Sequence, residues 1–582
     1  MKAVYKILLV MVVVSLGSCD FLEPETDNTR EADVLEDPAY FCGPLNAAYG
    51  NLPSTFNPDM DAMTDNAVIR DFGGDYYNAG VGRLSPSMNP LGCWASNYAN
   101  IRLLNIFLGR MVLSDRGYRT PIRFFALNNE TDYENNLKMF WRLKGEAYAL
   151  RAYYYFDLLR NYAGEGENGQ MLGVPLVGNK VLDQKQDLDI PRATLEDCVK
   201  AIVDDCDSAI VVGRLPDLYS GTVDVVYNQS LSPHISGAAA KAIKAQTLLL
   251  YASPAYNTEN DRVRWEAAAK AAAEAIKAVG GIGTKFYSLE EYYFSKINNT
   301  SITQDNVIMK GKWITGDRSL ENMNYPSALY GRATVNVSQN LVDSFTDKDG
   351  YPIAESAYFD PAKPFDNRDA RLDLYVGRDG GTIGKYVIDI SEDGAERYNP
   401  LTCTSRSGYY LKKTLNCNQV ILGPSNAVKG TPRACVMIGL PELYLMFAEA
   451  ANEAWGVNDD PDGVGFTAKN ALARVLVKNN KTLDQYLNKV IGSDRDRFRE
   501  YTRNQRRVEL CFEGRYYYDL RRWYAANEDW AAKLNVTVRG IESTESAYNA
   551  IELEKRNFHA PYPPIPYSEV YNAGLIQNKG WN

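Results

Sequence analysis

Residues 141–162 read WRLKGEAYALRAYYYFDLLRNY. Apolar and aromatic side chains recur here at helical spacing, and one face of the predicted helix carries Leu143, Ala147, Leu150, Tyr154, Leu158 and Asn161. A second face carries Tyr148, Tyr155 and Tyr162. A helix with two such faces packs on both sides, as in a layered helical array. The stretch therefore predicts a central helix whose tyrosines are mostly packing residues.

Further helices are predicted on either side of this stretch. Their ranges are 94–112, 238–252, 265–281, 441–456 and 466–480. The first has an inward stripe made of Trp94, Tyr98, Ile101, Asn105, Leu108 and Val112. Small alanines at inner positions allow helices to approach closely. Paired antiparallel helices at this scale indicate a mainly α fold built from tetratricopeptide-like repeats.

Two stretches differ in character from the helices. Residues 53–93 and 282–435 are rich in Gly, Asn, Pro and Tyr and contain short β-like runs such as GYYLKK at 408–413. They predict long loops and small hairpins on the helical scaffold. Loops held by a rigid scaffold are where binding residues tend to lie.

The N-terminus predicts export and anchoring. Residues 1–18 have a positive start, an apolar run too short to span a bilayer, and small residues before Cys19. The segment Leu16-Gly17-Ser18-Cys19 looks like a bacterial lipobox, in which Cys19 is acylated. An ordinary signal peptide with a chance cysteine is the alternative. Residues 19–37 are acidic and aperiodic and predict a flexible tether, which leaves 38–582 as one domain.

The amino-acid composition argues against several classes of function. The net charge is −10, with no basic cluster of the kind that binds nucleic acid. The chain has 40 Tyr against 19 Phe, which suits surfaces that grip a ligand in water. There are only two histidines, His234 and His559, so the sequence does not favour a catalytic triad or a zinc site, both of which usually use histidine. No G-x-S-x-G or phosphate-loop motif occurs, and no cofactor is predicted.

Two features admit a chemical interpretation but favour a structural one, and a third is left open. Interleaved arginines and acids at 506–522 predict a paired structural network rather than a catalytic site. The run NDDPDG at 458–463 resembles the start of a calcium loop, but Lys469 stands where the closing Glu belongs, so a turn is predicted and no metal. Cys403 and Cys417 either pair or stay as free thiols; the sequence leaves both open.

Several segments, in order along the chain, resemble the SusD/RagB family of outer-membrane nutrient-binding lipoproteins of the Bacteroidetes. They are GEAYALRAYYYFDLLRNYAG at 145–164, LLLYASPAYN at 248–257, FTDKDGYPI at 345–353, NRDARLDLYV at 367–376, PELYLMFAEAANEA at 441–454, RRVELCFEGRYYYDLRRW at 506–523 and PPIPYSEVYNAGLIQNKGW at 563–581. Together they cover almost the whole chain after the tether.

The resemblance implies a single tetratricopeptide-like domain on the outer face of the outer membrane, anchored at Cys19. The implied partner is a SusC-like TonB-dependent transporter. The implied cargo is a glycan, or a peptide in some members. Asp20 and Glu23 resemble the acidic signal for surface export.

Related proteins bind their ligand through two loop regions, which correspond here to residues 69–83 and 312–331. Aromatic faces and polar side chains in these regions suit a sugar, and the candidate ligand-binding residues are Arg70, Asp71, Tyr76, Tyr77, Asn78, Arg83, Trp313, Tyr325 and Tyr330. The leading hypothesis is a non-catalytic glycan-binding lipoprotein. Peptide binding is the alternative, and a surface glycoside hydrolase or a purely structural scaffold is less favoured; 73 acidic residues leave a carboxylate pair open.

Overall fold

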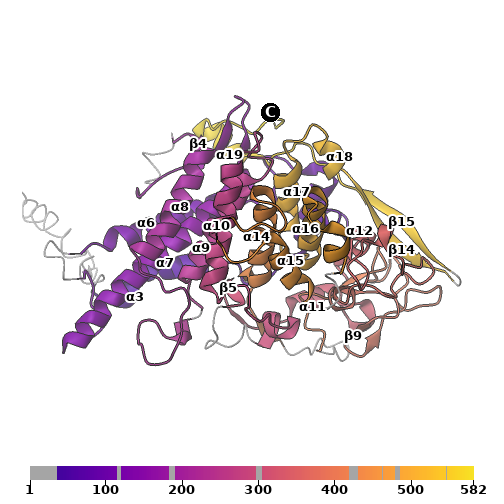
Figure 1. Cartoon of the computed structure of the whole chain (residues 1–582), viewed down its shortest axis with the longest axis horizontal. Coiled ribbons are helices and arrows are strands. Elements are labelled where there is room, and N and C mark those ends of the chain that lie inside the picture. The colour runs from indigo at the N-terminus through magenta and orange to yellow at the C-terminus, as the bar shows by residue number, and fades with distance from the viewer. Residues whose placement is uncertain are drawn as a thin grey trace, which may run out of the picture.

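The computed structural model describes residues 36–113, 120–181, 190–231, 233–295, 305–418, 430–461, 463–478, 485–544 and 547–581. Helices make up most of its regular structure, as predicted. In Figure 1, the helices of the first half lie at the left, the later helices fill the middle, and short strands and loops lie at the lower right. The predicted signal peptide, Cys19 and most of the tether lie outside the described residues.

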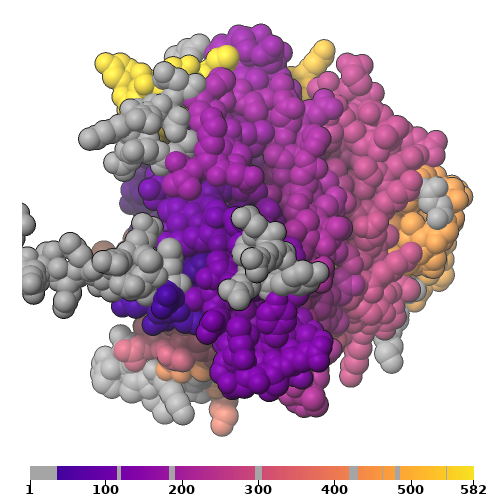
Figure 2. All heavy atoms as spheres, turned by 90° about the vertical axis from the view of Figure 1, so that its left-hand side faces the viewer, coloured from indigo at the N-terminus to yellow at the C-terminus, as the bar shows by residue number. Residues whose placement is uncertain are grey.

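The first half is a row of helices in chain order. Its helices are α3 (Pro38–Phe41), α4 (Gly43–Gly50), α6 (Trp94–Arg110), α7 (Glu130–Tyr162), α8 (Leu195–Val211), α9 (Gly237–Ala252) and α10 (Arg262–Ala278). From α6 to α10, each helix packs against the next one along the chain. Figure 2 shows this row from the side, with the colours running in chain order from purple to pink.

The boundaries of these helices follow from their caps. The side chain of Asn129 accepts a hydrogen bond from the backbone N–H of Asp132 at the start of α7, and Thr194 and Ser236 cap α8 and α9 in the same way. The predicted helix 94–112 ends two residues early, at Arg110. Val112, expected to face inward, is therefore exposed, because beyond the helix end it no longer shares the buried stripe.

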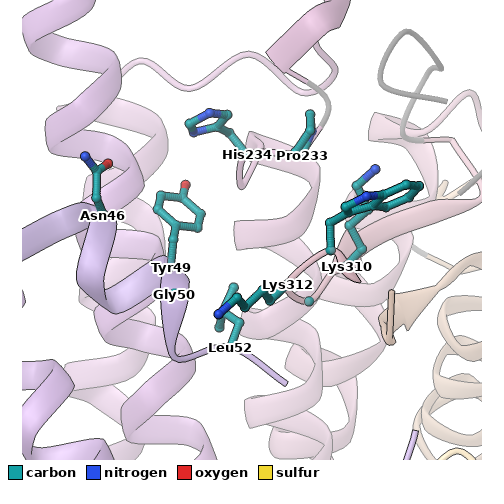
Figure 3. A pocket seen from close by; sticks show the side chains of 10 residues that line it. Asn46, Tyr49, Gly50, Leu52, Pro233, His234, Lys310 and Lys312 are labelled. Carbon is teal, nitrogen blue, oxygen red and sulfur yellow. The ribbon is translucent and has the colours of Figure 1, made fainter. Parts of the chain in front are cut away.

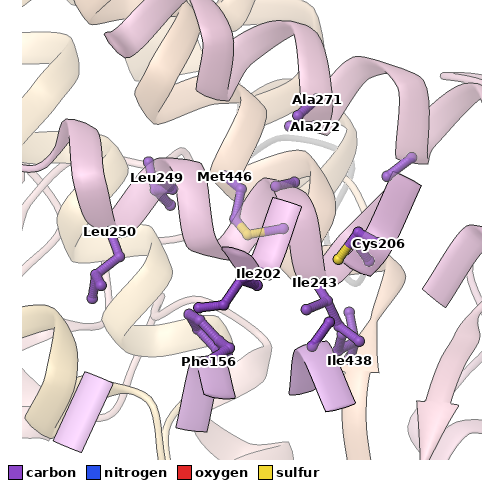
Figure 4. Close-up of a cluster of buried hydrophobic side chains, with 14 of the residues drawn as sticks. Phe156, Ile202, Cys206, Ile243, Leu249, Leu250, Ala271, Ala272, Ile438 and Met446 are labelled. Carbon is purple, nitrogen blue, oxygen red and sulfur yellow. The ribbon is translucent and has the colours of Figure 1, made fainter. Parts of the chain in front are cut away.

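The remaining helices come later in the chain, and α14 packs onto the end of this row. They are α14 (Leu440–Ala454), α15 (Ala468–Leu476), α16 (Arg495–Glu509), α17 (Tyr516–Tyr524), α18 (Trp530–Leu534) and α19 (Tyr567–Ala573). Helix α14 contacts α10, α15 and α16 and is buried along almost its whole length. Figure 4 shows side chains such as Phe156, Ile202 and Met446 meeting in the shared core. Buried alanines such as Ala271 and Ala272 keep the helices close.

The two loop-rich stretches contain only short elements. The first has η1 (Pro58–Met63), β1 (Ala67–Ile69), α5 (Asp75–Asn78) and η2 (Ala79–Arg83). The second has η4 (Glu291–Ser295), β5 (Val307–Lys310), β6 (Ile314–Asp317), α11 (Ser319–Asn324), η5 (Ser327–Leu329), β7 (Val335–Val337), α12 (Gln339–Ser344), η6 (Ile353–Glu355), α13 (Arg371–Tyr375), β8 (Val376–Gly377), β9 (Thr382–Ile383), β10 (Tyr386–Val387), β11 (Tyr410–Leu411), β12 (Thr431–Arg433) and β13 (Val436–Gly439).

Small antiparallel sheets hold these stretches together. The pairs are β1–β7, β5–β13, β6–β12, β8–β11 and β9–β10. Elsewhere, β2 (Gly164–Glu165), β3 (Met171–Pro175) and β4 (Arg192–Thr194) form one sheet, and β14 (Thr537–Ser543) and β15 (Tyr548–Lys555) form a long hairpin. The β1–β7 pair matters most for the site, because it joins the two loop-rich stretches, with Val68 opposite Asn336.

The charged cluster at 506–522 is a buried structural network, as predicted. Asp519 pairs with Arg506 and with Arg522, each at 2.8 Å. Arg522 also pairs with Glu449 at 2.6 Å. Glu509 accepts from Arg371 on α13, which ties the irregular region to the helices. Because each acid has a cationic partner, the network holds the last helices in register.

Two smaller questions from the sequence are also answered. Cys403 and Cys417 are both free thiols. In the calcium-like run, the Asp460 carboxylate accepts the backbone N–H groups of Val464 at 2.7 Å and Gly465 at 2.6 Å. Asp460 therefore closes a turn, as predicted for this run, while Asp462 lies outside the described residues.

Candidate functional site

The end of β1 and the start of β7 bring the two loop-rich stretches together at the protein surface. The backbone N–H of Arg70 donates to the Thr334 carbonyl at 2.8 Å, which extends the β1–β7 pairing by one step. The chain then turns outward through Asp71 and Phe72 into α5. We call Arg70, Asp71, Phe72, Tyr77 and Arg406 the Phe72 surface.

A phenyl ring stands at the centre of the Phe72 surface. The side chain of Phe72 is 65% exposed. The guanidinium of Arg406 lies 4.4 Å from the ring centroid, and the Tyr77 ring meets it edge to face at 85°, with 5.4 Å between the two centroids. Cation–π and edge-to-face contacts of this kind hold a ring in place. The ring is therefore fixed on one side and open to solvent.

Arg406 is itself anchored. Its Nη1 donates to the Ile69 carbonyl at 2.7 Å and pairs with the Glu554 carboxylate at 3.1 Å. Both side chains of this ion pair are buried. The support beneath Phe72 is thus tied to β1 on one side and to β15 on the other, so the ring sits on a rigid base.

Polar groups border the ring. Arg70 pairs with the exposed carboxylate of Asp71 at 2.5 Å, and its Nη1 lies 3.4 Å from the Thr402 carbonyl. Further along, Arg83 donates to the side-chain oxygen of Asn78 at 2.9 Å. These groups supply charged donors and acceptors next to an apolar face, which is the combination that sugar recognition needs.

A second feature is a hollow of about 550 Å³, the Trp313 pocket, shown in Figure 3. It lies where α4, the segment before α9 and the connection from β5 to β6 meet. Tyr49, His234, Lys310, Lys312 and Trp313 line it. No residue of 70–83 is among its lining, so Trp313 does not share a pocket with the Phe72 surface.

The comparisons with known proteins place the chain in a family. A family model described as SusD family matches residues 260–581, which is more than half of the chain. The chain belongs to the SusD family. A second model, described as starch-binding associating with outer membrane, matches residues 45–242. The resemblance stated from sequence segments is thereby confirmed.

Solved structures of SusD-like proteins share the fold over nearly the full length. A SusD-like protein from Bacteroides fragilis is 20% identical, with 96% of this chain and 100% of that chain covered and a TM-score of 0.71. A SusD-like carbohydrate binding protein from Bacteroides fragilis is also 20% identical, with 92% and 98% covered and a TM-score of 0.67. A laminarin binding SusD-like protein is 18% identical, with 94% and 100% covered and a TM-score of 0.55. The curated proteins contain no match.

In this SusD family member, the predicted site residues separate into groups. Arg70, Asp71 and Tyr77 belong to the Phe72 surface, and Asn78 and Arg83 lie on the adjoining α5 and η2. Tyr76 is half-buried against a hydrophobic cluster that includes side chains of α17, and its hydroxyl accepts a hydrogen bond from Asn57. Tyr330 is 48% exposed, and Trp313 lines the separate pocket. Their roles in ligand binding stay predictions.

Tyr325 departs from the expectation for a ligand-binding side chain. It is fully buried in the core of the irregular region, and its hydroxyl donates to the Asn416 carbonyl. Helix α11 ends at Asn324, so Tyr325 follows directly on a helix that packs inward and is carried into the core with it. It therefore has no surface to offer a ligand in this structure.

Sequence reasoning missed the ring at the centre of the Phe72 surface and the arginine beneath it. Phe72 stands inside the candidate stretch, between Asp71 and Gly73, so its neighbours were a usable signal. Arg406 is more than 300 residues away along the chain, and no sequence pattern linked it to Phe72.

Among the described residues, no group of three or more His, Cys, Asp or Glu is placed to hold a metal ion. None of the described helices is long and apolar enough to cross a membrane.

Proposed function

We propose that this protein is a non-catalytic, cell-surface lipoprotein that captures glycans on the Phe72 surface and passes them to a SusC-like TonB-dependent transporter. One observation carries the proposal: an exposed phenyl ring is held by Arg406 and Tyr77 and is bordered by the Arg70–Asp71 pair. The flat C–H face of a pyranose packs on such a ring, and its hydroxyls bond to the charged groups around it.

The rigidity of the base strengthens this assignment. Because Arg406 is tied to Ile69 and Glu554, the ring is already in position before a ligand arrives. Little side-chain freedom is then lost on binding, which favours affinity at a small contact area. An exposed phenylalanine without such support would present the same ring but would lose more side-chain conformational entropy when a ligand binds.

The family supports the cargo and the location. One matching family model is described as starch-binding associating with outer membrane, and two similar structures are described as carbohydrate binding and laminarin binding. We extend a glycan ligand and an outer-membrane location to this chain on that basis. The lipid anchor at Cys19 and the transporter partner are part of the proposal and rest on the sequence resemblance.

The test replaces Phe72 with Ala and measures retention in native gels that contain a panel of polysaccharides. We expect the dissociation constant for the bound glycan to rise by about tenfold, since the lost ring face contributes on the order of 1 kcal/mol or more. Tyr40→Ala is the matched control, because Tyr40 is 64% exposed but lies on α3. It should leave retention unchanged.

The same samples separate the rival functions. Release of reducing ends from a retained polysaccharide would show a glycoside hydrolase. Binding of a peptide library with no polysaccharide retained would point to peptide cargo. Equal retention of the wild type and Phe72→Ala would remove the Phe72 surface from the site.

A further inference from the structure

Glu396 differs from the acids of the buried network at 506–522. The residue is fully buried, with 0% of its surface exposed. Asp519 lies between two arginines, and the buried Glu321 pairs with Arg433 at 2.6 Å. Among the described residues, the partners of the Glu396 carboxylate are instead all uncharged donors. Burying a carboxylate without a cation is costly, so the position of these donors matters.

Three donors reach this carboxylate from three separate segments of the irregular region. Its Oε1 accepts the Ala328 backbone N–H at 3.2 Å and the Tyr386 hydroxyl at 3.0 Å, and its Oε2 accepts the Tyr410 hydroxyl. A carboxylate suits this place because it only accepts hydrogen bonds. Burial and, after it, the Glu396 charge raise the pKa of both phenols. Both therefore stay protonated and donate.

The Oε2 side of the carboxylate leads to the Phe72 surface. Tyr410 on β11 is fully buried, and its hydroxyl oxygen accepts the backbone N–H of Ser405 at 3.1 Å. Ser405 directly precedes Arg406, whose guanidinium lies 4.4 Å from the centroid of the Phe72 ring. A continuous chain of hydrogen bonds therefore runs from Glu396 to the backbone that carries the support of the ring.

The Oε1 side holds the turn that ends at Tyr330. Ala328 lies within η5, and Tyr330 closes this turn in the left-handed conformation, at a φ of 61°. This conformation is strained for a residue with a side chain, so it persists where neighbouring groups fix the turn. Tyr330 is 48% exposed and is one of the predicted ligand-binding residues. Glu396 thus joins the turn of Tyr330 to the segment of Arg406.

Arg406 also has anchors that do not involve this carboxylate. Its Nη1 donates to the Ile69 carbonyl and pairs with Glu554, and its backbone N–H donates to the side-chain oxygen of Asn336 at 2.9 Å. These contacts tie it to β1, β15 and β7. The fold should therefore survive the loss of the Tyr410 contact, while the segment under the ring gains freedom.

We propose that Glu396 is a positioning residue for glycan capture. Acting through Tyr410, it fixes the backbone beside Arg406 and thereby the Phe72 ring. Because Glu396 is fully buried, it does this without touching the ligand. A ring that is held from behind loses less freedom when a sugar packs on it, which favours binding. The inference rests on the proposed function of the Phe72 surface.

The experiment is a double-mutant cycle on the purified protein, read as retention in native gels that contain laminarin or soluble starch. We expect Tyr410→Phe to raise the dissociation constant about threefold, because a buried N–H loses its partner and the segment loosens. Tyr410→Phe combined with Phe72→Ala should bind no more weakly than Phe72→Ala alone, since the hydroxyl acts through the ring. Additive losses would mark a merely structural role and overturn the proposal.

Tyr386→Phe is the matched control. It removes a phenol bond from Oε1 of the same carboxylate and leaves the bond between Oε2 and Tyr410 intact. Retention should stay at the wild-type level, and a loss equal to that of Tyr410→Phe would overturn the proposal. If Tyr410→Phe does not fold, Glu396→Gln takes its place. It turns one acceptor into a donor and should weaken retention by about threefold.

Hydrogen–deuterium exchange without glycan separates this inference from the proposed function. The Ser405 amide, followed in peptides that cover residues 403–408, should exchange about tenfold faster in Tyr410→Phe and at the wild-type rate in Tyr386→Phe. Unchanged exchange in Tyr410→Phe would overturn the inference, whichever polysaccharide is retained. Equal retention of the wild type and Phe72→Ala, with faster exchange in Tyr410→Phe, would remove the proposed function and keep Glu396 as a support of the ring.

Discussion

Residues 506–522 and residues 69–83 have the same chemistry in sequence and opposite surroundings in the structure. Both stretches mix arginines, acids and tyrosines. In the first, Asp519 is buried between Arg506 and Arg522. In the second, Asp71 pairs with Arg70 at the surface, beside an exposed ring. The difference teaches that burial and complete pairing mark a structural network, whereas exposed polar groups around a supported ring are free to meet a ligand, which is the role we propose for the second stretch.

The largest effect should come from breaking the buried network. Asp519→Ala leaves Arg506 and Arg522 buried with one partner fewer each. We expect the free energy of unfolding to fall by about 3–5 kcal/mol, the cost typical of removing one partner from a buried ion-pair network. Denaturant unfolding followed by circular dichroism measures it. A loss below about 1 kcal/mol would contradict the structural reading of the network.

Acidification should weaken the same network. Burial opposes ionisation of Glu449 and Glu509, but Arg522 acts on Glu449, and Lys478 and Arg371 act on Glu509. Both carboxyl pKa values are thereby lowered from 4.5 to about 2. A pKa that is lower in the folded state adds stability above the unfolded value, and that stability is lost as the pH falls from 4.5 toward 2.

The measurement is the unfolding midpoint as a function of pH, from about pH 7 down to about pH 2. The midpoint should fall most steeply within the window between the two pKa values. Glu449→Gln should make the decline shallower, because one of the two titrating groups is gone. A midpoint that stays constant through the window would show that these acids are not held ionised by the fold.

The smallest effect on stability should come from the exposed pair. Asp71→Ala removes an ion pair whose carboxylate is mostly in solvent, so the free energy of unfolding should change by no more than about 0.5 kcal/mol. Glycan retention should nevertheless weaken by about threefold, if Asp71 accepts a sugar hydroxyl. Large destabilisation with unchanged retention would place Asp71 in the structural class, beside Asp519.

Individual residues show which structural features could be predicted from the sequence. The helix at 141–162, the packing role of Trp94 and the paired network at 506–522 follow from spacing and residue type, and the structure confirms them. The candidate loop at 69–83 was named from the family resemblance and stays a prediction, and its most exposed ring, Phe72, was not among the residues named. Tyr325 and Val112 were misplaced because helix ends at Asn324 and Arg110 decided which way the chain turned.

The sequence by itself determined the helical scaffold, because apolar spacing and caps act between residues that are close along the chain. It also determined the family, through segments that keep their order from end to end. Only the tertiary structure decided that Arg406 supports Phe72 and that Tyr49, His234 and Trp313 line one pocket. These contacts join residues hundreds of positions apart, and their geometry depends on short strands and turns whose pairing no local pattern specifies.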